Sequence, residues 1–262
     1  MRDAWRLALG TLTAVPVTPP TEVTPKVAGR AMLLAPFAVV PLGVLVGLVV
    51  WAGKELALPQ LGTGLVAVGV LALGSRAFHL DGLSDVADGL TSSYDRERSL
   101  AVMKSGSSGP AGTVALVVVL GVQAVGFGAL VFLPYGAVLA GALVCLSRAA
   151  LLLTCARGVP GARPDGLGSS FVGSVPAAAA LLGWVLVIVA TAGLVAWSGD
   201  GWIKGGVTAL VALVVVLVLI QRAVHRFGGV TGDVYGAAIE VTLAVLVLGA
   251  SGGGFGWLAY TP

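Results

Sequence analysis

The sequence predicts an all-α integral membrane protein, a polytopic bundle of about seven transmembrane helices with a cytoplasmic N-terminus. Long apolar stretches recur along the chain, and most Lys and Arg residues fall on one side of the expected membrane. Only 10% of the residues are charged and the mean hydropathy is +1.01, whereas soluble domains carry about 25% charged residues. Such a composition is typical of a protein surrounded by lipid.

Seven stretches are apolar enough to cross a hydrocarbon core about 30 Å thick, which takes about 20 residues of helix. A tight turn at residues 134–136 separates the third stretch from the fourth. No change of composition marks a second domain, so residues 1–262 are expected to form one integral-membrane domain. The stretches are residues 32–51, 61–80, 113–133, 137–156, 177–197, 207–220 and 237–258.

The distribution of basic residues predicts the orientation. Lys54 and Lys204 fall on one side of a seven-helix arrangement, Arg148 falls within a helix, and the other side holds all remaining basic residues. Because Lys and Arg concentrate in cytoplasmic loops, that basic side is expected to face the cytoplasm of a bacterial inner membrane. This sorting also explains the net charge of +3, so the expected partner is the lipid bilayer and not a nucleic acid.

The first group of candidate site residues is acidic and follows the second stretch. Asp81, Asp85 and Asp88 are spaced i, i+4, i+7, so on a helix they share one face within about 60° of arc. Carboxylates this close repel one another unless a cation intervenes. Hard oxygen ligands suit Mg²⁺, which binds carboxylates together with substrate phosphates. The pattern predicts a Mg²⁺ site, and the alternative is a solvated polar turn.

A second motif precedes and enters the last stretch. Gly229 and Gly232 would allow a ligand to approach the backbone, and Thr231 offers a hydroxyl group. Asp233 adds a carboxylate on the same side of the membrane as the first group. Glu240 lies two helical turns further on, and an ionisable residue in a membrane helix is a functional candidate. The alternative for this motif is helix–helix packing.

Arg148 and His79 are two further ionisable candidates. Leaving Arg148 in lipid would be costly, so it should face the bundle interior and meet either Glu240 or a substrate diphosphate. On a straight helix His79 would point about 160° away from the face of Asp81. It would then cap the helix, contact a lipid headgroup, or act as a general base.

Together, the motifs resemble the cobalamin synthase family (adenosylcobinamide-GDP ribazoletransferase). The resemblance covers most of the chain, in five ordered blocks. It departs at residues 105–107, where many relatives have Asp-Ser-Arg, and at Leu243, where many have an acid. The matching residues are His79, Leu80, Asp81, Gly82, Asp85, Asp88, Gly89, Asp95, Arg96, Met103, Lys104, Ser147, Arg148, Arg163, Gly166, Leu167, Gly168, Gly229, Thr231, Gly232, Asp233, Gly236, Ala237 and Glu240.

The resemblance implies an enzyme that joins adenosylcobinamide-GDP to α-ribazole or its 5′-phosphate, giving adenosylcobalamin or its phosphate, and GMP. On this basis Mg²⁺ is the expected cofactor, held by Asp81, Asp85 and Asp88. A homo-oligomer is compatible with the sequence. The expected catalytic residues are these three with Asp233 and His79; the expected substrate-binding residues are Arg96, Lys104, Arg148, Arg226, Gly229, Thr231, Gly232 and Glu240.

Two other kinds of function stay open at this point. One is another Mg²⁺-dependent membrane transferase, although a CDP-alcohol phosphotransferase would carry an Arg in the run that follows Gly82, which has none. An aromatic prenyltransferase would carry two Asp-rich clusters, and the chain has one. The other is a transporter, whose acids should lie near mid-membrane within paired repeats, and no internal repeat is found.

Overall fold

The structure, a computed structural model, describes residues 1–166 and 168–252 and is predominantly α-helical. Within these residues, six helices or helix pairs are long and apolar enough to cross a membrane, and a bent pair is a seventh candidate. The six are α2 (Pro25–Ala38) with α3 (Val40–Glu55), α7 (Pro110–Leu130), α8 (Gly136–Ser147) with α9 (Ala150–Thr154), α10 (Ala177–Trp197), α11 (Trp202–Phe227) and α12 (Gly232–Ser251).

The bent pair differs from the predicted second stretch. α4 (Gln60–Gly74) and α5 (Phe78–Ser92) meet at 96°. Between them, Arg76 and Ala77 adopt the left-handed conformation, with φ of 57° and 54°, which side-chain-bearing residues rarely occupy. Nη2 of Arg76 donates a hydrogen bond to the carbonyl of Gly10 at 2.6 Å and ties this break to the N-terminal segment. A single straight helix through residue 80 was therefore the wrong prediction, and the acidic motif lies on its own helix.

Other predicted stretches coincide with observed spans, but some ends differ. α11 is longer than predicted at both ends. α12 begins before the predicted residue 237 because Thr231 caps it, with Oγ1 accepting a hydrogen bond from the amide of Val234 at 3.4 Å. The last six residues of the predicted stretch 237–258 lie outside the described residues.

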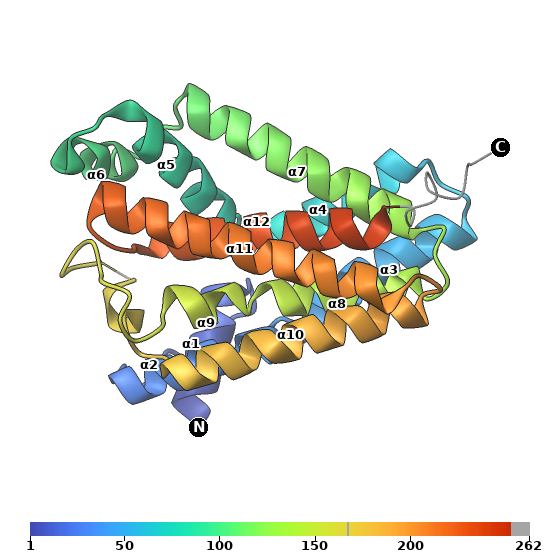
Figure 1. The fold of residues 1–262 in the computed structure, drawn as a ribbon, viewed down its shortest axis with the longest axis horizontal. Helices are drawn as coiled ribbons and strands as arrows, with labels where there is room; N and C mark the ends of the chain where they lie inside the picture. Colours follow the sequence, from blue (N-terminus) through green and yellow to red (C-terminus); the bar gives the residue numbers. More distant parts are fainter. Residues whose placement is uncertain (167, 253–262) are drawn as a thin grey trace.

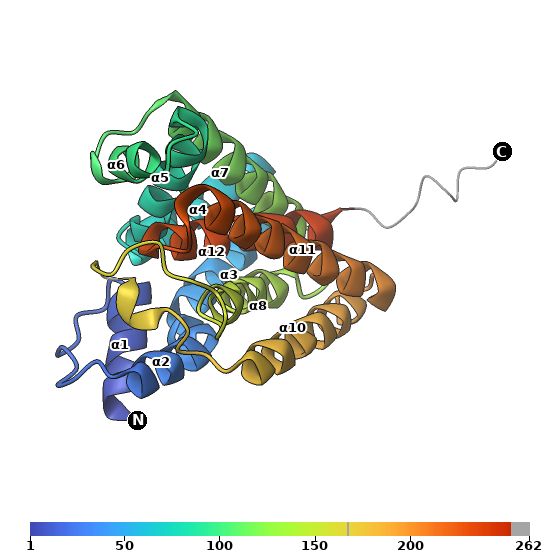
Figure 2. The ribbon, with the colours of Figure 1, turned by 60° about the vertical axis from the view of Figure 1, so that its left-hand side comes forward.

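The spans run back and forth between two ends of the bundle (Figure 1). α5 and α6 (Arg96–Lys104) lie at the same end as the first turns of α2, α7, α10 and α12. Figure 2 shows α5 and α6 on one side of this end, with α1 (Arg2–Leu12) and α2 on the other. A short 3₁₀ helix, η1 (Ser169–Phe171), belongs to the loop that joins α9 to α10.

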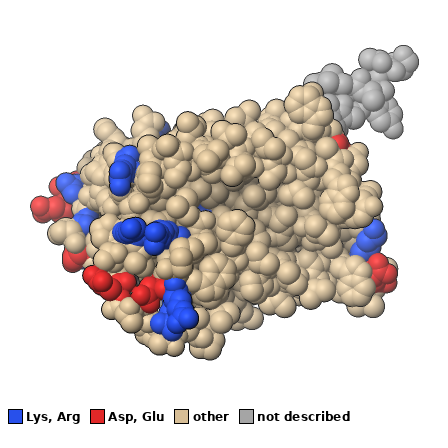
Figure 3. All heavy atoms as spheres, turned by 90° about the horizontal axis from the view of Figure 1, so that it is seen from below, with Lys and Arg blue, Asp and Glu red and all other residues tan. Residues whose placement is uncertain are grey.

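Charged side chains gather at the ends of the bundle. Figure 3 shows Lys, Arg, Asp and Glu mainly at one end, fewer at the other, and a broad uncharged band between them. Large apolar side chains stay exposed along the spans, among them Val117, Val189 and Val211. An apolar surface of this extent is expected where helices contact lipid. The chain is a multi-pass, all-α membrane protein, as predicted.

Small residues allow some helices to pack closely. A Cβ atom on Gly43 of α3 would lie 2.6 Å from the carbonyl oxygen of Gly141 of α8, and one on Gly47 would lie 2.8 Å from that of Ala137. Close backbone approach of this kind is typical of membrane helices. α12 is the most enclosed of these spans, since 72% of its 18-residue apolar stretch is buried, against 28% of the corresponding stretch of α10.

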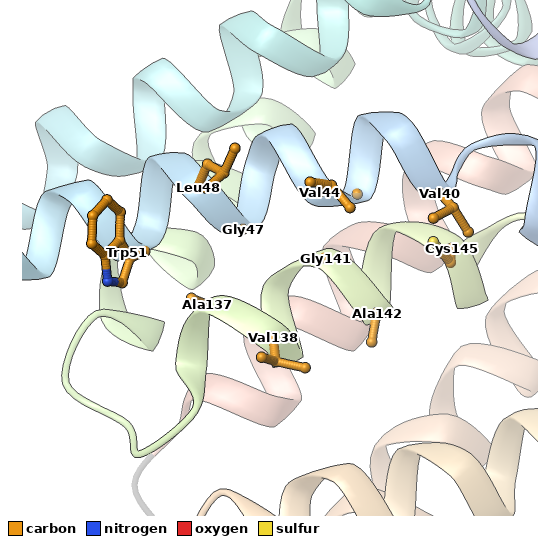
Figure 4. A pocket seen from close by; sticks show the side chains of 11 residues that line it. Val40, Val44, Gly47, Leu48, Trp51, Ala137, Val138, Gly141, Ala142 and Cys145 are labelled. Atoms are coloured by element: carbon orange, nitrogen blue, oxygen red, sulfur yellow. The ribbon is translucent and has the colours of Figure 1, made fainter.

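An apolar groove of about 620 Å³ lies along the contact between α3 and α8 (Figure 4). Val44, Leu48 and Trp51 of α3 line it together with Val138 of α8. No charged residue lines it, and its polar side-chain atoms are those of the Trp51 indole and the Cys145 thiol, so it offers no cation for a phosphate and no carboxylate for Mg²⁺. None of the ionisable site candidates lines this groove.

Candidate active site

The two acidic motifs meet where α5 crosses the start of α12. A Cβ atom on Gly82 would lie 2.7 Å from the carbonyl oxygen of Asp233, and one on Gly236 would lie 2.9 Å from Cα of His79. Only glycine permits the two backbones to come this close. These two glycines therefore bring together segments that lie about 150 residues apart in the chain.

Three carboxylates share this end of the bundle. Asp81 is exposed, whereas Asp85 and Asp233 are half-buried, and all three interact electrostatically with one another. Oδ2 of Asp233 accepts a hydrogen bond from Oγ1 of Thr231 at 3.0 Å. Within the described part of the chain, the side chains of Asp81 and Asp85 accept no hydrogen bond. Their oxygens are available to a cation or a substrate.

Asp88 differs from the other acids of the predicted metal set. Its side chain is 6% exposed, and its two oxygens accept hydrogen bonds from the backbone amides of Gly109 at 2.6 Å and Gly112 at 2.9 Å. These amides belong to the N-terminus of α7, where a carboxylate is stabilised by the free N–H groups and the helix dipole. Nearby, the hydroxyls of Ser84 and Ser108 are 2.8 Å apart. Asp88 therefore connects α5 to α7.

The predicted three-ligand metal site is not preformed. Among residues 1–166 and 168–252, no three His, Cys, Asp or Glu side chains lie close enough to hold one metal ion. Mg²⁺ does not need such a cage, because it usually keeps several waters and binds through one or two carboxylates and substrate phosphates. Asp81 and Asp85, one helical turn apart and free of hydrogen bonds, fit that requirement.

The loop between α9 and α10 covers the start of α12. The amide of Val230 donates to the carbonyl of Pro160 at 2.8 Å, and the amide of Ala162 donates to that of Val230 at 2.9 Å. Oη of Tyr235 donates to the carbonyl of Gly168 at 3.2 Å. A Cβ atom on Gly229 would clash with this loop, because it would lie only 2.4 Å from the carbonyl oxygen of Pro160. The close backbone approach that Gly229 permits is therefore to this loop, whereas the sequence predicted an approach to a ligand.

Two of the four predicted basic binding residues, Arg226 and Arg96, contact the backbone of neighbouring segments. Nη2 of Arg226 donates to the carbonyl of Leu90 at 2.9 Å, and its guanidinium lies 4.6 Å from the ring centroid of Tyr94. Nη2 of Arg96 donates to the carbonyl of Ala162, also at 2.9 Å. Arg226 therefore connects the end of α11 to α5, and Arg96 connects α6 to the loop between α9 and α10.

Two other basic side chains lie near this end. Nζ of Lys104 is 3.6 Å from a carboxylate oxygen of Asp165, and both side chains are exposed. Arg163 donates to the carbonyl of Leu100 at 2.6 Å and interacts electrostatically with Asp85 and Asp233. Of the basic residues, Arg163 is therefore the one that the structure brings to the acids.

A second polar group lies beneath the acids, inside the bundle. His79, Arg148 and Glu240 are 3%, 1% and 6% exposed, so His79 is neither at a lipid headgroup nor free in solvent. Nδ1 of His79 is 3.7 Å from Oε1 of Glu240, and Arg148 interacts electrostatically with both residues. Arg148 interacts electrostatically with Glu240, one of the two partners expected for it, but no ion pair joins the two side chains in the described structure. Gln123 of α7 donates to Oε2 of Glu240 at 2.8 Å.

Comparison with known proteins gives the family. The model of the cobalamin-5-phosphate synthase family matches residues 4–251. This chain belongs to that family. A protein of Nocardioides named adenosylcobinamide-GDP ribazoletransferase is 55% identical over 248 residues, covering 95% of this chain and 98% of the relative. No solved structure matches the chain.

More distant members of the cobalamin-5-phosphate synthase family carry the same name. The chain is 40% identical to a protein of Pseudomonas paraeruginosa, over 94% of this chain and 98% of that one. It is 35% identical to a protein of Frankia casuarinae, over 93% and 92% respectively. The family match includes both acidic motifs and the buried polar group, so the whole site lies within the shared region.

Sequence reasoning missed two residues of this site. Gln123 is the only amide in an otherwise apolar predicted span, and a polar side chain in such a helix was the available signal. Arg163 was matched within a family motif but was not included among the binding residues. Leu167, from the same motif, lies outside the described residues.

Proposed function

We propose that this member of the family is an adenosylcobinamide-GDP ribazoletransferase. It joins adenosylcobinamide-GDP to α-ribazole, or to α-ribazole 5′-phosphate, and releases GMP with adenosylcobalamin or its 5′-phosphate. The observation that carries the proposal is the meeting of Asp81 and Asp85 with Asp233 at one end of the bundle, in a chain whose relatives are named for this reaction. Such acids suit a reaction at a diphosphate.

Asp81 and Asp85 are the residues we assign to a Mg²⁺ ion. Both carboxylates lie on one face of α5, and neither accepts a hydrogen bond from the described residues. When bound there, Mg²⁺ would neutralise the diphosphate of the substrate and the charge that develops on the departing phosphate. Asp88 is assigned to the fold instead, because its two oxygens are occupied by amides of α7.

The transfer makes one bond and breaks one. The 5′ hydroxyl oxygen of the ribazole bonds to the phosphorus nearer the corrin, and the bond from that phosphorus to the bridging oxygen breaks. GMP leaves with the bridging oxygen and the electron pair. The hydroxyl proton passes to Asp233, whose Oδ2 is oriented by Thr231 at 3.0 Å, so that Oδ1 is free to act as the base.

Binding of the phosphates is assigned to the start of α12 and to Arg163. The N-terminus of a long helix attracts anions through its free amides and its dipole, which supports a role for Thr231 and Gly232. Arg163 lies beside Asp85 and Asp233 and would steady the transferring phosphoryl group. Lys104 and Arg96 lie on the adjacent α6 and would contact the outer part of the substrate.

The active site is proposed to face the cytoplasm across a bacterial inner membrane. Apart from Lys54, Lys204 and the buried Arg148, the basic residues lie in loops or near helix ends on the side of the bundle that holds α5 and α6. Lys and Arg concentrate on the cytoplasmic side of membrane proteins, which supports this orientation.

Measuring GMP release tests the function. Membranes that contain the protein should release GMP only when adenosylcobinamide-GDP, α-ribazole and Mg²⁺ are all present. Asp85→Asn should lower turnover by about 1,000-fold or more, because it removes a carboxylate assigned to the Mg²⁺ that would stabilise the transition state. The variant should still insert into membranes at the normal level. Normal turnover by Asp85→Asn, or no GMP release by the parent protein, would contradict the proposal.

A further inference from the structure

Four buried polar side chains from different parts of the bundle meet beneath the acids. His79 comes from α5, Gln123 from α7, Arg148 from the break between α8 and α9, and Glu240 from α12. Each is at least nine-tenths buried. Four segments that are far apart in the chain therefore place polar side chains inside an otherwise apolar bundle, and Glu240 contacts both His79 and Gln123. We call these residues the buried cluster.

The charges of the buried cluster balance. Arg148 supplies one positive charge and Glu240 one negative charge, and the two interact electrostatically. Nη1 of Arg148 also donates to the carbonyl of Val144 and to Oγ of Ser147, each at 2.9 Å. Burying a pair of charges is tolerated only when each has its partner, because removing one leaves the other uncompensated.

Three polar atoms of the buried cluster make no hydrogen bond in the described structure, and one of them is a carboxylate oxygen that can accept one. Nδ1 of His79 and Nε of Arg148 are buried without a hydrogen-bond partner in the described structure. Oε2 of Glu240 is occupied by Gln123, whereas Oε1 accepts no hydrogen bond and lies 3.7 Å from Nδ1 of His79. A hydrogen bond needs about 3 Å, so a shift of less than about 1 Å would join α5 to α12 at this point.

His79 lies two residues before Asp81 on α5, and Glu240 lies seven residues after Asp233 on α12. A contact between His79 and Glu240 therefore fixes the same two helices whose ends carry the acids. We propose that the buried cluster positions α5 against α12 and so sets the spacing of Asp81, Asp85 and Asp233, without touching substrate. This proposal rests on the proposed function of the acids. It assigns Arg148 and Glu240 a positioning role in place of the substrate contact predicted from the sequence.

The test compares Glu240→Gln, Arg148→Met and the double variant, each purified in detergent. Both single variants should melt earlier than the parent protein, and the double variant should melt later than either, because it leaves no unpaired charge. Thr191→Val is the matched control: Thr191 of α10 is equally buried, and its hydroxyl also has no partner among the described residues. A double variant that melts no later than the more stable of the two single variants would overturn the electrostatic coupling of Arg148 with Glu240.

Two further measurements separate positioning from substrate contact. In Glu240→Gln, amide hydrogen exchange should speed up in α5 and stay unchanged in α10. For GMP release, kcat should fall about tenfold or more while KM for adenosylcobinamide-GDP stays within about twofold. A tenfold rise in KM with unchanged exchange in α5 would mean direct substrate contact and overturn the proposal. Should the parent protein release no GMP, the proposed function fails, and melting and exchange alone decide the buried cluster.

Discussion

The acids at the end of the bundle and the buried cluster beneath them lie on the same two helices but follow opposite rules. Asp81, Asp85 and Asp233 are like charges with access to water, and no basic residue forms an ion pair with them within the described structure. Arg148 and Glu240 are oppositely charged side chains that are buried in the bundle and interact electrostatically. The first arrangement is costly until a cation arrives, whereas the second combines opposite charges and needs no added ion to offset repulsion.

This difference separates residues that act on substrate from residues that hold the site. A polar side chain in a membrane helix is a functional candidate by default, yet only the residues that stay accessible can meet a phosphate. Asp88 shows that the division does not follow sequence motifs. It belongs to the acidic motif of α5, but its oxygens are committed to the amides of Gly109 and Gly112.

Gly236→Ala is expected to have the largest combined effect on stability and activity, because it disturbs both the acids and the buried cluster. The added Cβ atom would lie 2.9 Å from Cα of His79, so α5 and α12 must move apart. Overpacking of this kind costs about 1–3 kcal/mol of stability, and we expect GMP release to fall with it. Thermal melting in detergent and GMP release measure the two effects.

Gly121→Ala in α7 is the control for this variant. A Cβ atom on Gly121 would meet no atom within 4 Å, and alanine favours a helix over glycine by about 1 kcal/mol. This variant should melt no earlier than the parent protein and release GMP normally. Equal behaviour of the two glycine variants would argue against a tight crossing of α5 and α12.

A smaller effect on stability is expected from Asp88→Ala. Loss of a carboxylate that caps a helix costs about 1–2 kcal/mol, which should appear as earlier melting and faster amide exchange at the start of α7. The Mg²⁺ concentration that gives half-maximal GMP release should stay the same, because Asp88 does not hold the ion. A marked rise in that concentration would move Asp88 back among the metal ligands.

The sequence predicted the spans well because a helix that crosses lipid must be long and apolar. Such helices are visible in the sequence as long apolar stretches. It failed at residues 75–77, where the chain leaves α4 without a Pro. Arg76 and Ala77 are held in a rare backbone conformation by a contact with Gly10, and a contact 66 residues away leaves no local signal.

The same limit applies to the site. Helical spacing placed Asp81, Asp85 and Asp88 on one face, but it could not show that Asp88 meets amides 21 and 24 residues further along the chain. The spacing of Asp233 and Glu240 indicated their shared face on α12. What it could not supply was the depth of each residue in the bundle, which decides between contact with substrate and contact with Arg148 and Gln123.

Binding of Mn²⁺, a paramagnetic substitute for Mg²⁺, tests the central claim most directly, because it requires no turnover. Purified protein is titrated with Mn²⁺, and the free ion is measured by electron paramagnetic resonance for the parent protein, Asp85→Asn and Asp88→Asn. We predict that Asp85→Asn weakens binding by about tenfold or more, while Asp88→Asn stays within about twofold of the parent. Loss of binding in Asp88→Asn together with normal binding in Asp85→Asn would contradict the division of these acids into metal ligands and a structural cap.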